Sequence, residues 1–294
     1  MDRVDLPEAH FQEYRAQLRA VAYRMLGSLS EADDAVQETW LRLSRSDVSE
    51  VENWHAWLTT VVTRICLDML RARSARREYP LDVHVPDPIV TPVEDDPEQH
   101  ALLADSIGLA LLVVLDTLSP AERIAFVLHD VFAVPYDQVG PILDRSPAAA
   151  KQLASRARRR LRGSPSAGTA VDPARQRAVA DAFNSASRDG DFEGLLAVLD
   201  PDVVLRVDTG DGPAGPSVLI RGAAEVAAQA ERYASMARFA HPVLVNGAPG
   251  MLIAPNRKPF ALIAIATRDD KITEIDILAD PDRLSRMNLT ALIP

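Results

Sequence analysis

The stretch from Tyr136 to Arg162 constrains the fold of this chain more than any other segment. It predicts a short amphipathic helix over residues 136–143, a tight polar turn over 144–146, and a second helix that opens at Pro147. The second helix carries a run of lysine and arginine side chains and no acid. A helix of this kind after a short turn is the layout that presents side chains to a DNA major groove. The alternative is a helical hairpin with a solvated basic face, because cations also suit a helix C-terminus.

The charge balance limits what such a helix could do alone. The 294-residue chain has a net charge of −10, whereas a free-standing DNA-binding protein is usually basic. DNA contact should therefore be local or depend on a partner. The single cysteine, Cys66, rules out an internal disulfide and a multi-cysteine zinc site, and the sequence predicts no metal and no cofactor. The chain opens on no signal-peptide pattern and holds no bilayer-spanning apolar run, which predicts a cytoplasmic protein without a membrane partner.

Composition divides the chain into segments. Residues 8–78 read as helical throughout, and residues 79–104 are rich in proline and acids, which predicts an extended, mobile linker. Helices resume near Ala101, and a serine, a proline and a glutamate at 119–122 mark a helix start. The second helical region ends near Arg162.

The last 120 or so residues show a different pattern, in which strand-like runs follow helices. Two helices are predicted over 174–199 and one over 222–237, with strand-like runs at 203–207, 242–246, 251–254, 260–267 and 272–278. Helices followed by a curved antiparallel sheet predict an α+β domain. The predicted architecture is multidomain: two all-α domains over 1–78 and 105–163, joined by the linker 79–104, and an α+β domain over 173–294 after a second linker, 164–172.

Three parts of the chain carry a family resemblance. The segments YRMLGSLSEADDAVQETWLRL and NWHAWLTTVVTRICLDMLRARSARRE resemble region 2 of bacterial sigma factors of the extracytoplasmic-function group. The segment LDTLSPAERIAFVLHDVFAVPYDQVGPILDRSPAAAKQLASRARRRL resembles their region 4. The final domain resembles the SnoaL-like α+β cone, with DFEGLLAVLDPDVVLRVD and DPDRL as its motifs. The resemblance implies a sigma factor that binds core RNA polymerase, recognises the −35 and −10 promoter elements and starts transcription, with a regulatory domain fused to it.

For polymerase binding, the resemblance points to the region 2 helix over residues 32–43, which would dock on the clamp helices of the largest subunit. Its acids need a basic partner surface, so the contact should weaken with salt. The alternative is a solvated, well-capped helix start. The residues expected to bind core polymerase are Asp33, Asp34, Gln37, Glu38 and Leu41.

Melting the −10 element requires surfaces that stack on unpaired bases and cations that follow a single strand. The loop over residues 45–52 is expected to hold a flipped base. Trp57 is in register with the apolar face of its helix and is expected in the core, whereas Trp54 is undecided between core and DNA. The residues predicted for the −10 element are Asn53, Trp54, His55, Arg64, Arg71 and Arg73.

For the −35 element, Gln152 and Arg156 lie one turn apart and can read base edges, while the neighbouring cations suit phosphates. Small residues at 148–150 permit a close approach to DNA. The residues predicted for this contact are Arg145, Lys151, Gln152, Ser155, Arg156, Arg158 and Arg159.

The C-terminal domain offers weak candidates for catalysis. An isomerase needs a general base and an oxyanion donor at one cavity. Asp276 alternates with Ile275 and Ile277, which is compatible with a solvent-facing side chain, and Asp208 is equally compatible with a turn. No settled pair emerges, so the sequence predicts no enzyme and leaves a small-molecule ligand open. The candidates for catalysis are Asp208, Asp276, His241 and Tyr233.

The resemblance instead implies that this domain contacts sigma regions 2 and 4 and tunes activity. The loop at 211–215 departs from the glycine-rich motif of the family, whereas the tail at 280–284 fits its pattern. The residues expected to serve this regulatory role are Asp208, Asp211, Asp280, Asp282 and Arg283.

Two rival functions make different predictions. A small-molecule isomerase or hydratase with helical appendages would turn over substrate with residues 173–294 alone. A helix-turn-helix repressor would bind duplex DNA without polymerase, which the acidic total disfavours.

Overall fold

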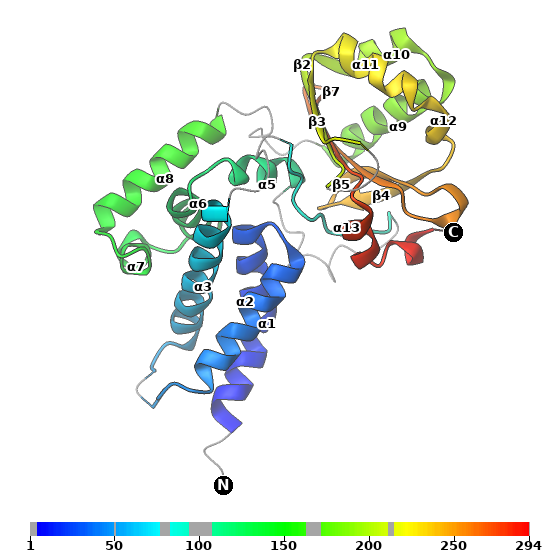
Figure 1. Cartoon of the computed structure of the whole chain (residues 1–294). Coiled ribbons are helices and arrows are strands. Elements are labelled where there is room, and N and C mark those ends of the chain that lie inside the picture. Colours follow the sequence, from blue (N-terminus) through cyan, green and yellow to red (C-terminus); the bar gives the residue numbers. More distant parts are fainter. Residues whose placement is uncertain are drawn as a thin grey trace. The chain divides into compact units, whose positions relative to one another are not determined.

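The computed structural model describes residues 5–49, 51–76, 83–93, 108–162, 172–210 and 215–293. The chain forms two compact units, shown in Figure 1. The first unit comprises Met1–Glu78 and Leu115–Leu161, and the second comprises Tyr79–Val114 and Arg162–Pro294. Both helical regions thus belong to one unit, and the segment that joins them along the chain belongs to the other. Among the described residues, no helix combines the length and apolar character that crossing a bilayer requires.

The N-terminal part of the first unit is a bundle of α1, α2 and α3, in which each helix packs on the other two. Met25, Leu58, Val62 and Cys66 lie in its core. Helix α3 also packs on α6 and α7. The helices of this part are α1 (Asp5–Leu26), α2 (Leu29–Leu43) and α3 (Trp54–Arg76).

The second part of this unit begins at the end of α5. The start signal at Ser119 is confirmed: its side chain accepts from the Glu122 amide and the Glu122 side chain accepts from the Ser119 amide, a capping box. The helix then widens into one π-helical turn, η1, before a loop leads to the last two helices. The elements are α5 (Leu109–Asp116), α6 (Pro120–Phe126), η1 (Val127–Val131), α7 (Tyr136–Ile142) and α8 (Pro147–Arg162).

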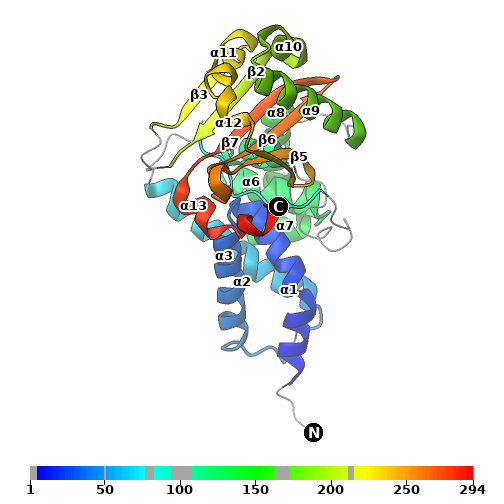
Figure 2. The same cartoon turned by 90° about the vertical axis from the view of Figure 1, so that its right-hand side faces the viewer.

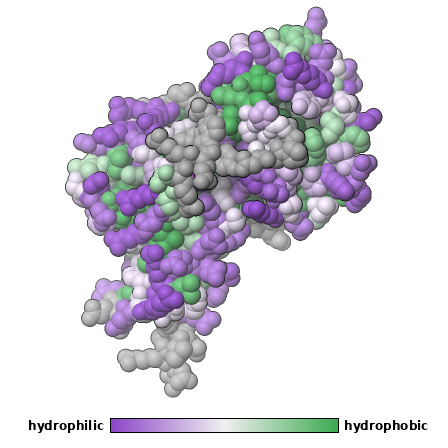
Figure 3. Space-filling model, in the orientation of Figure 1, coloured by the Kyte–Doolittle hydropathy of each residue, from purple (hydrophilic) through white to green (hydrophobic). Residues whose placement is uncertain are grey.

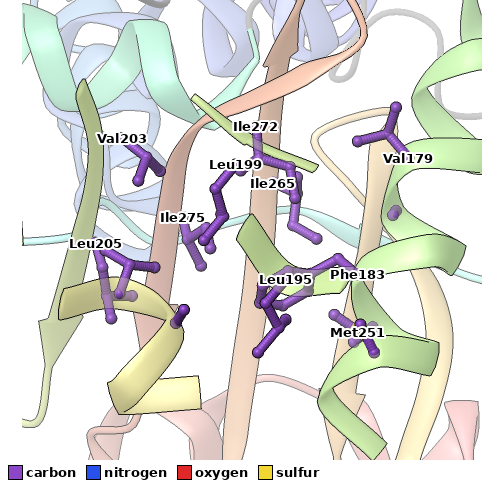
Figure 4. Packing of buried hydrophobic residues seen from close by; sticks show 14 residues of the cluster. Val179, Phe183, Leu195, Leu199, Val203, Leu205, Met251, Ile265, Ile272 and Ile275 are labelled. Carbon is purple, nitrogen blue, oxygen red and sulfur yellow. The ribbon is translucent and has the colours of Figure 1, made fainter. Parts of the chain in front are cut away.

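The second unit is a seven-stranded sheet in the order β1-β4-β5-β6-β7-β2-β3. Helices α9, α10 and α11 cover one face of it (Figures 2 and 4). Phe183 of α9 and Leu195 of α10 are buried there against Ile265 and Ile275 of the sheet. The elements of this unit are β1 (Val90–Thr91), α9 (Pro173–Asp189), α10 (Phe192–Val198), β2 (Leu199–Asp208), β3 (Val218–Arg221), α11 (Ala223–Arg232), α12 (Ala234–Ala237), β4 (Ala240–Val245), β5 (Ala248–Ile253), η2 (Pro255–Arg257), β6 (Ala261–Arg268), β7 (Lys271–Leu278), α13 (Pro281–Arg286) and η3 (Leu289–Leu292).

The α+β class is confirmed, but the prediction of a purely antiparallel sheet is wrong. Strand β2 pairs with β7 in parallel, with Arg206 opposite Asp276, while the other neighbouring strands are antiparallel. Parallel neighbours need a long crossover, and most of the domain lies between these two strands in the sequence. Strands β1 and β3 were not predicted, because each is too short to show a clear alternation.

The predicted mobile linker contains an ordered segment. Residues 83–93 lie on the sheet of the second unit, and β1 pairs with β4 at its edge. The Ile89 amide donates to Asn246 Oδ1 and the Asn246 amide donates to the Ile89 carbonyl, both at 2.8 Å. The expectation of mobility fails here because a distant residue satisfies the backbone of a segment that has no periodicity of its own. The remainder of the predicted linker lies outside the described residues.

Candidate nucleic-acid interface

The turn between α7 and α8 is tight because of Gly140. The Arg145 amide donates to the Gly140 carbonyl at 2.9 Å, and Asp144 has a left-handed backbone with φ of 54°. A Cβ on Gly140 would lie 2.8 Å from the Arg145 carbonyl oxygen, so only glycine permits this approach. Ser146 Oγ accepts from the Ala149 amide at 3.2 Å and caps α8. The segment is therefore a helix-turn-helix.

Helix α8 has one buried face and one exposed face. Its buried face is made of Ala150, Ala154, Ala157 and Leu161. The small side chains bring α8 close to the rest of the unit, and the surface over α7 and α8, at the left of Figure 3, is mostly hydrophilic. Six of the seven residues predicted for the −35 element are exposed here or in the turn: Arg145, Lys151, Gln152, Ser155, Arg156 and Arg159.

Arg158, the seventh predicted residue, has internal partners. Its Nη2 donates to Tyr136 Oη at 2.6 Å, and its Nε lies 2.8 Å from Asp130 Oδ1. Only 36% of its side chain is exposed. No local sequence pattern predicts this pairing, since Tyr136 precedes Arg158 by 22 residues and Asp130 lies further back still.

Helix α2 presents the residues predicted to bind polymerase. Asp34, Gln37 and Leu41 are exposed at helical spacing, and Leu41 is one of the few large apolar side chains exposed in the described part of the chain. Asp33 pairs with Arg19 at 2.6 Å and Glu38 pairs with Arg42 at 3.0 Å. These exposed pairs contribute little to stability and leave the carboxylates available to a stronger basic surface.

The start of α3 contacts α1. Asn53 Oδ1 accepts from the Ala56 amide at 2.9 Å and caps the helix. The Trp54 ring stacks on His10 with centroids 4.8 Å apart, and His55 Nε2 lies 2.9 Å from Gln17 Nε2. Trp57, expected in the core, is half-buried. The aromatic and amide groups predicted for the −10 element thus gather at one end of the bundle.

The arginines further along α3 are engaged within the unit. Arg64 donates to the Pro141 carbonyl at 3.3 Å, and Arg71 lies 3.8 Å from Asp68. Arg73 donates twice to the Leu26 carbonyl at the end of α1, and lies 3.5 Å from Glu31 and 3.7 Å from Asp116. Sequence reasoning missed Asp116 and its buried partner Arg123, which form an ion pair nearby.

In the second unit, three of the predicted regulatory residues converge at one end of the sheet. Asp280 caps α13 by accepting from the amides of Asp282 and Arg283. The cap positions Arg283, whose Nη1 donates to Asp208 Oδ2 at 2.8 Å and whose Nε donates to Asp87 Oδ1 at 2.7 Å. Asp282 itself is exposed, and the fifth predicted residue, Asp211, lies outside the described residues.

Asp208 also holds the linker directly. The Val85 amide donates to its Oδ2 at 2.9 Å, and His84 Nδ1 lies 3.3 Å from the same oxygen. Burial opposes the ionised form, but hydrogen bonds from His84 and Val85 and the charge of Arg283 lower the pKa of Asp208 to about 2. We call the set Asp87, Asp208 and Arg283 the linker clamp. Sequence reasoning missed Asp87, whose only signal was its position between two prolines.

The candidates for catalysis are placed differently from one another. Asp276 is buried, not solvent-facing, and lies 3.0 Å from the Arg206 guanidinium. Burial raises the pKa of Asp276 although Arg206 opposes the shift. His241 lies on β4, and Tyr233 is 55% exposed at the end of α11. Asp208 and Asp276 each pair with an arginine, so both carboxylates take part in ion pairs within the fold.

Comparison with known proteins shows which family models match the two helical regions. The family model for sigma-70 region 2 matches residues 10–76, and that for sigma-70 region 4 matches residues 108–161. A region 2 bundle followed by a region 4 helix-turn-helix defines a sigma factor of the sigma-70 class.

Relatives cover almost the whole chain. It is 37% identical over 293 residues to the "Probable ECF RNA polymerase sigma factor SigI" of Mycobacterium tuberculosis, covering 97% of both chains. It is 36% identical to the ECF RNA polymerase sigma factor SigJ of that organism, covering 94% of this chain and 93% of SigJ. The crystal structure of M. tuberculosis SigJ superposes with a TM-score of 0.77, covering 96% of this chain and 99% of that one. The chain belongs to the extracytoplasmic function (ECF) family of RNA polymerase sigma factors.

Family membership makes the chain a promoter-recognising sigma factor of RNA polymerase with a sheet-containing C-terminal extension, as in SigJ. The predicted fold class and family are confirmed.

Proposed function

We propose that this sigma factor binds core polymerase, the −10 strand and the −35 element through three separate surfaces of the first unit. Helix α2 docks on core polymerase through Asp34, Gln37 and Leu41. The start of α3 captures the opened −10 strand, and the exposed face of α8 reads the −35 element. We propose that it acts in the cytoplasm, the location that the sequence predicts, because its proposed partner is RNA polymerase.

One observation carries the α8 assignment: polar and cationic side chains occupy one face, opposite a buried face of small residues. Gln152 and Arg156 lie one turn apart on the exposed face, where each can form bidentate bonds to base edges. The surrounding cations supply the phosphate attraction that an acidic chain otherwise lacks.

Run-off transcription with purified core polymerase and a promoter library tests this assignment. Arg156→Ala should reduce discrimination between the preferred promoter and its −35 variants by about 1–3 kcal/mol. Arg175→Ala is the matched control, because Arg175 is an exposed arginine of the second unit. Equal weakening on every promoter would reduce Arg156 to a phosphate contact, and no effect at all would remove α8 from the interface.

The polymerase contact has a separate test. Changing Asp34 to Lys should weaken assembly with core enzyme, and the loss should shrink as salt is raised, because an exposed charge contact is screened. Asp68→Lys is the control, since Asp68 is also exposed but lies on α3. Equal loss with both variants would reflect net charge and would remove α2 from the polymerase interface.

We also propose that the C-terminal unit tunes activity by controlling the path of the linker between regions 2 and 4. The clamp supports this role, because Arg283 and Asp208 hold residues 85 and 87 of that linker. A linker tied at its middle gives the two DNA-binding regions less reach than a free chain of the same length.

Arg283→Gln should therefore change transcription output from a given promoter in the reconstituted system. Arg286→Gln is the matched control, because Arg286 lies on the same helix and is exposed. Identical output from parent and both variants, over promoters of different spacing, would refute a regulatory role for the clamp.

The same contacts argue against an enzyme. Asp208 and Asp276 are each engaged by an arginine, and Tyr233 is exposed on the helical side of the unit. We propose that the unit acts by binding alone. Turnover of an isomerase or hydratase substrate by the full chain, abolished by Asp276→Asn, would overturn this view.

A further inference from the structure

Helix α7 begins without a side-chain cap. Its N-cap is Pro135, which makes no side-chain cap bond, and Asp137 Oδ1 accepts from the Gln138 amide at 3.1 Å. Its first residue, Tyr136, is held in another way: the ring stacks on His129 of η1, with centroids 3.8 Å apart and planes 23° from parallel. His129 Nδ1 in turn lies 3.0 Å from the Val134 carbonyl. The junction between η1 and α7 therefore depends on side-chain contacts of Tyr136.

Arg158 of α8 completes this junction. Its guanidinium donates to Tyr136 Oη and pairs with Asp130 of η1. One side chain of the recognition helix thus joins both the π-helical turn and the first helix of the helix-turn-helix. The planar fork of arginine can serve two acceptors in fixed directions, which lysine cannot.

A contact between Arg158 and a DNA phosphate would have to break this arrangement. The Asp130 carboxylate would lose its cation, and burial already raises the pKa of Asp130 against the effect of Arg158. Tyr136 Oη would lose its donor in the same step. In contrast, Arg156 and Arg159 are exposed, and the structure records no hydrogen bond or ion pair for either among the described residues. Those two arginines can reach DNA without breaking a bond.

We propose that Arg158 is a positioning residue: through Tyr136 and Asp130 it sets the orientation of α8 on α7, and it does not contact DNA. This inference rests on the proposed role of α8 at the −35 element. It corrects the prediction that Arg158, like neighbouring cations of α8, contacts a phosphate, and it makes Tyr136 a determinant of promoter binding although that residue carries no charge.

The salt dependence of promoter binding tests the proposal, because each phosphate contact contributes about 0.9 to the slope of log K against log salt. The assay uses holoenzyme assembled from the full chain and core polymerase, bound to the duplex that gives the strongest run-off signal in the library. The first variant is Tyr136→Phe, which removes the acceptor of the Arg158 hydrogen bond without changing charge. The second combines Arg158→Gln with Asp130→Asn, which keeps the net charge constant. Arg159→Gln is the phosphate-contact control.

Tyr136→Phe and the Arg158/Asp130 pair should each weaken binding by about tenfold and leave the slope unchanged. Combining them should weaken binding by little more than either alone, since groups in one network are not additive. Arg159→Gln should lower the slope by about 0.9. A slope lowered by that amount in the Arg158/Asp130 variant, with Tyr136→Phe binding like the parent, would overturn the proposal.

Two further outcomes are distinguishable. If Arg156→Ala and Arg159→Gln bind like the parent in affinity and slope, the role of α8 at the −35 element has failed, and the positioning role fails with it. If those controls behave as expected but Tyr136→Phe and the Arg158/Asp130 variant both bind like the parent, only the positioning role is wrong. Tyr136→Phe retains the ring stack on His129, so a variant expected to fold remains even if the double charge change destabilises the unit.

Discussion

Replacing Asp208 by Asn should release the linker from the C-terminal unit. The pKa of this carboxyl is lowered from 3.8 to about 2, so its surroundings favour the ionised form by about 2 kcal/mol at neutral pH, since one pKa unit corresponds to about 1.4 kcal/mol. Asn has the same shape but no charge for Arg283 and one acceptor in place of two. The free energy that holds residues 83–93 on the sheet should fall by at most that amount, because part of the shift comes from Arg283 and not from the segment. The open fraction then rises by up to about 30-fold.

Hydrogen–deuterium exchange of the full chain at pH 7 measures this fraction. The Val85 amide, 2.9 Å from Asp208 Oδ2, should exchange faster in the variant by up to about 30-fold, as should its neighbours in the segment, if local opening limits exchange. Asp270→Asn is the matched control, because Asp270 pairs with Arg175 at 3.7 Å and both side chains are more than half exposed. That substitution should leave residues 83–93 unchanged.

Unchanged protection of Val85 in Asp208→Asn would refute the reasoning, because the carboxylate would then not hold the segment. Faster exchange in β6 and β7 as well would also count against it, since that pattern reports global unfolding of the unit and not local release.

Three other perturbations follow from the geometry. Because the folded-state pKa of Asp208 is depressed, its contribution to holding the linker is complete above about pH 4 and is lost as the pH falls towards 2. Pepsin should therefore cleave the linker of the parent increasingly fast over that range. An Asp208→Asn chain with the same pH profile of cleavage would contradict this. Asp116→Asn leaves Arg123, 2% exposed, without its buried partner, and should destabilise the first unit by about 3–5 kcal/mol in urea unfolding, whereas the exposed Asp68→Asn should change stability by less than about 0.5 kcal/mol. Gly140→Ala places a methyl group 2.8 Å from a backbone oxygen of the turn and should cost about 1–3 kcal/mol by the same assay; a neutral result would show that the turn relaxes freely.

Most features of the helical regions could be predicted from patterns of residues that are close together in the sequence. The cap at Ser146 and the helix start at Ser119 each depend on residues within one or two turns, so they are visible in the sequence. The one-turn spacing of Gln152 and Arg156 placed both on one face of α8, and both are exposed. Strands were less predictable, because the short β1 and β3 exist only through their partners, β4 and β2.

Side-chain pairing was the part that sequence could not supply. Arg158 looked like its neighbours in a basic run, and only the folded unit shows it bound to Asp130 and Tyr136. Asp276 alternated with isoleucines as a solvent-facing residue would, yet it is buried beside Arg206.

The sequence by itself determined the order of the modules, the helix-turn-helix and the family, because these depend on local spacing and on motifs read along the chain. The tertiary structure alone decided which charges are free to meet DNA and which hold the protein together, and that a segment resembling a loose linker is clamped by Asp208 and Arg283. The physical reason is that a charge finds its partner across space: residues 87 and 283 lie 196 positions apart in the chain and within hydrogen-bonding distance in the fold.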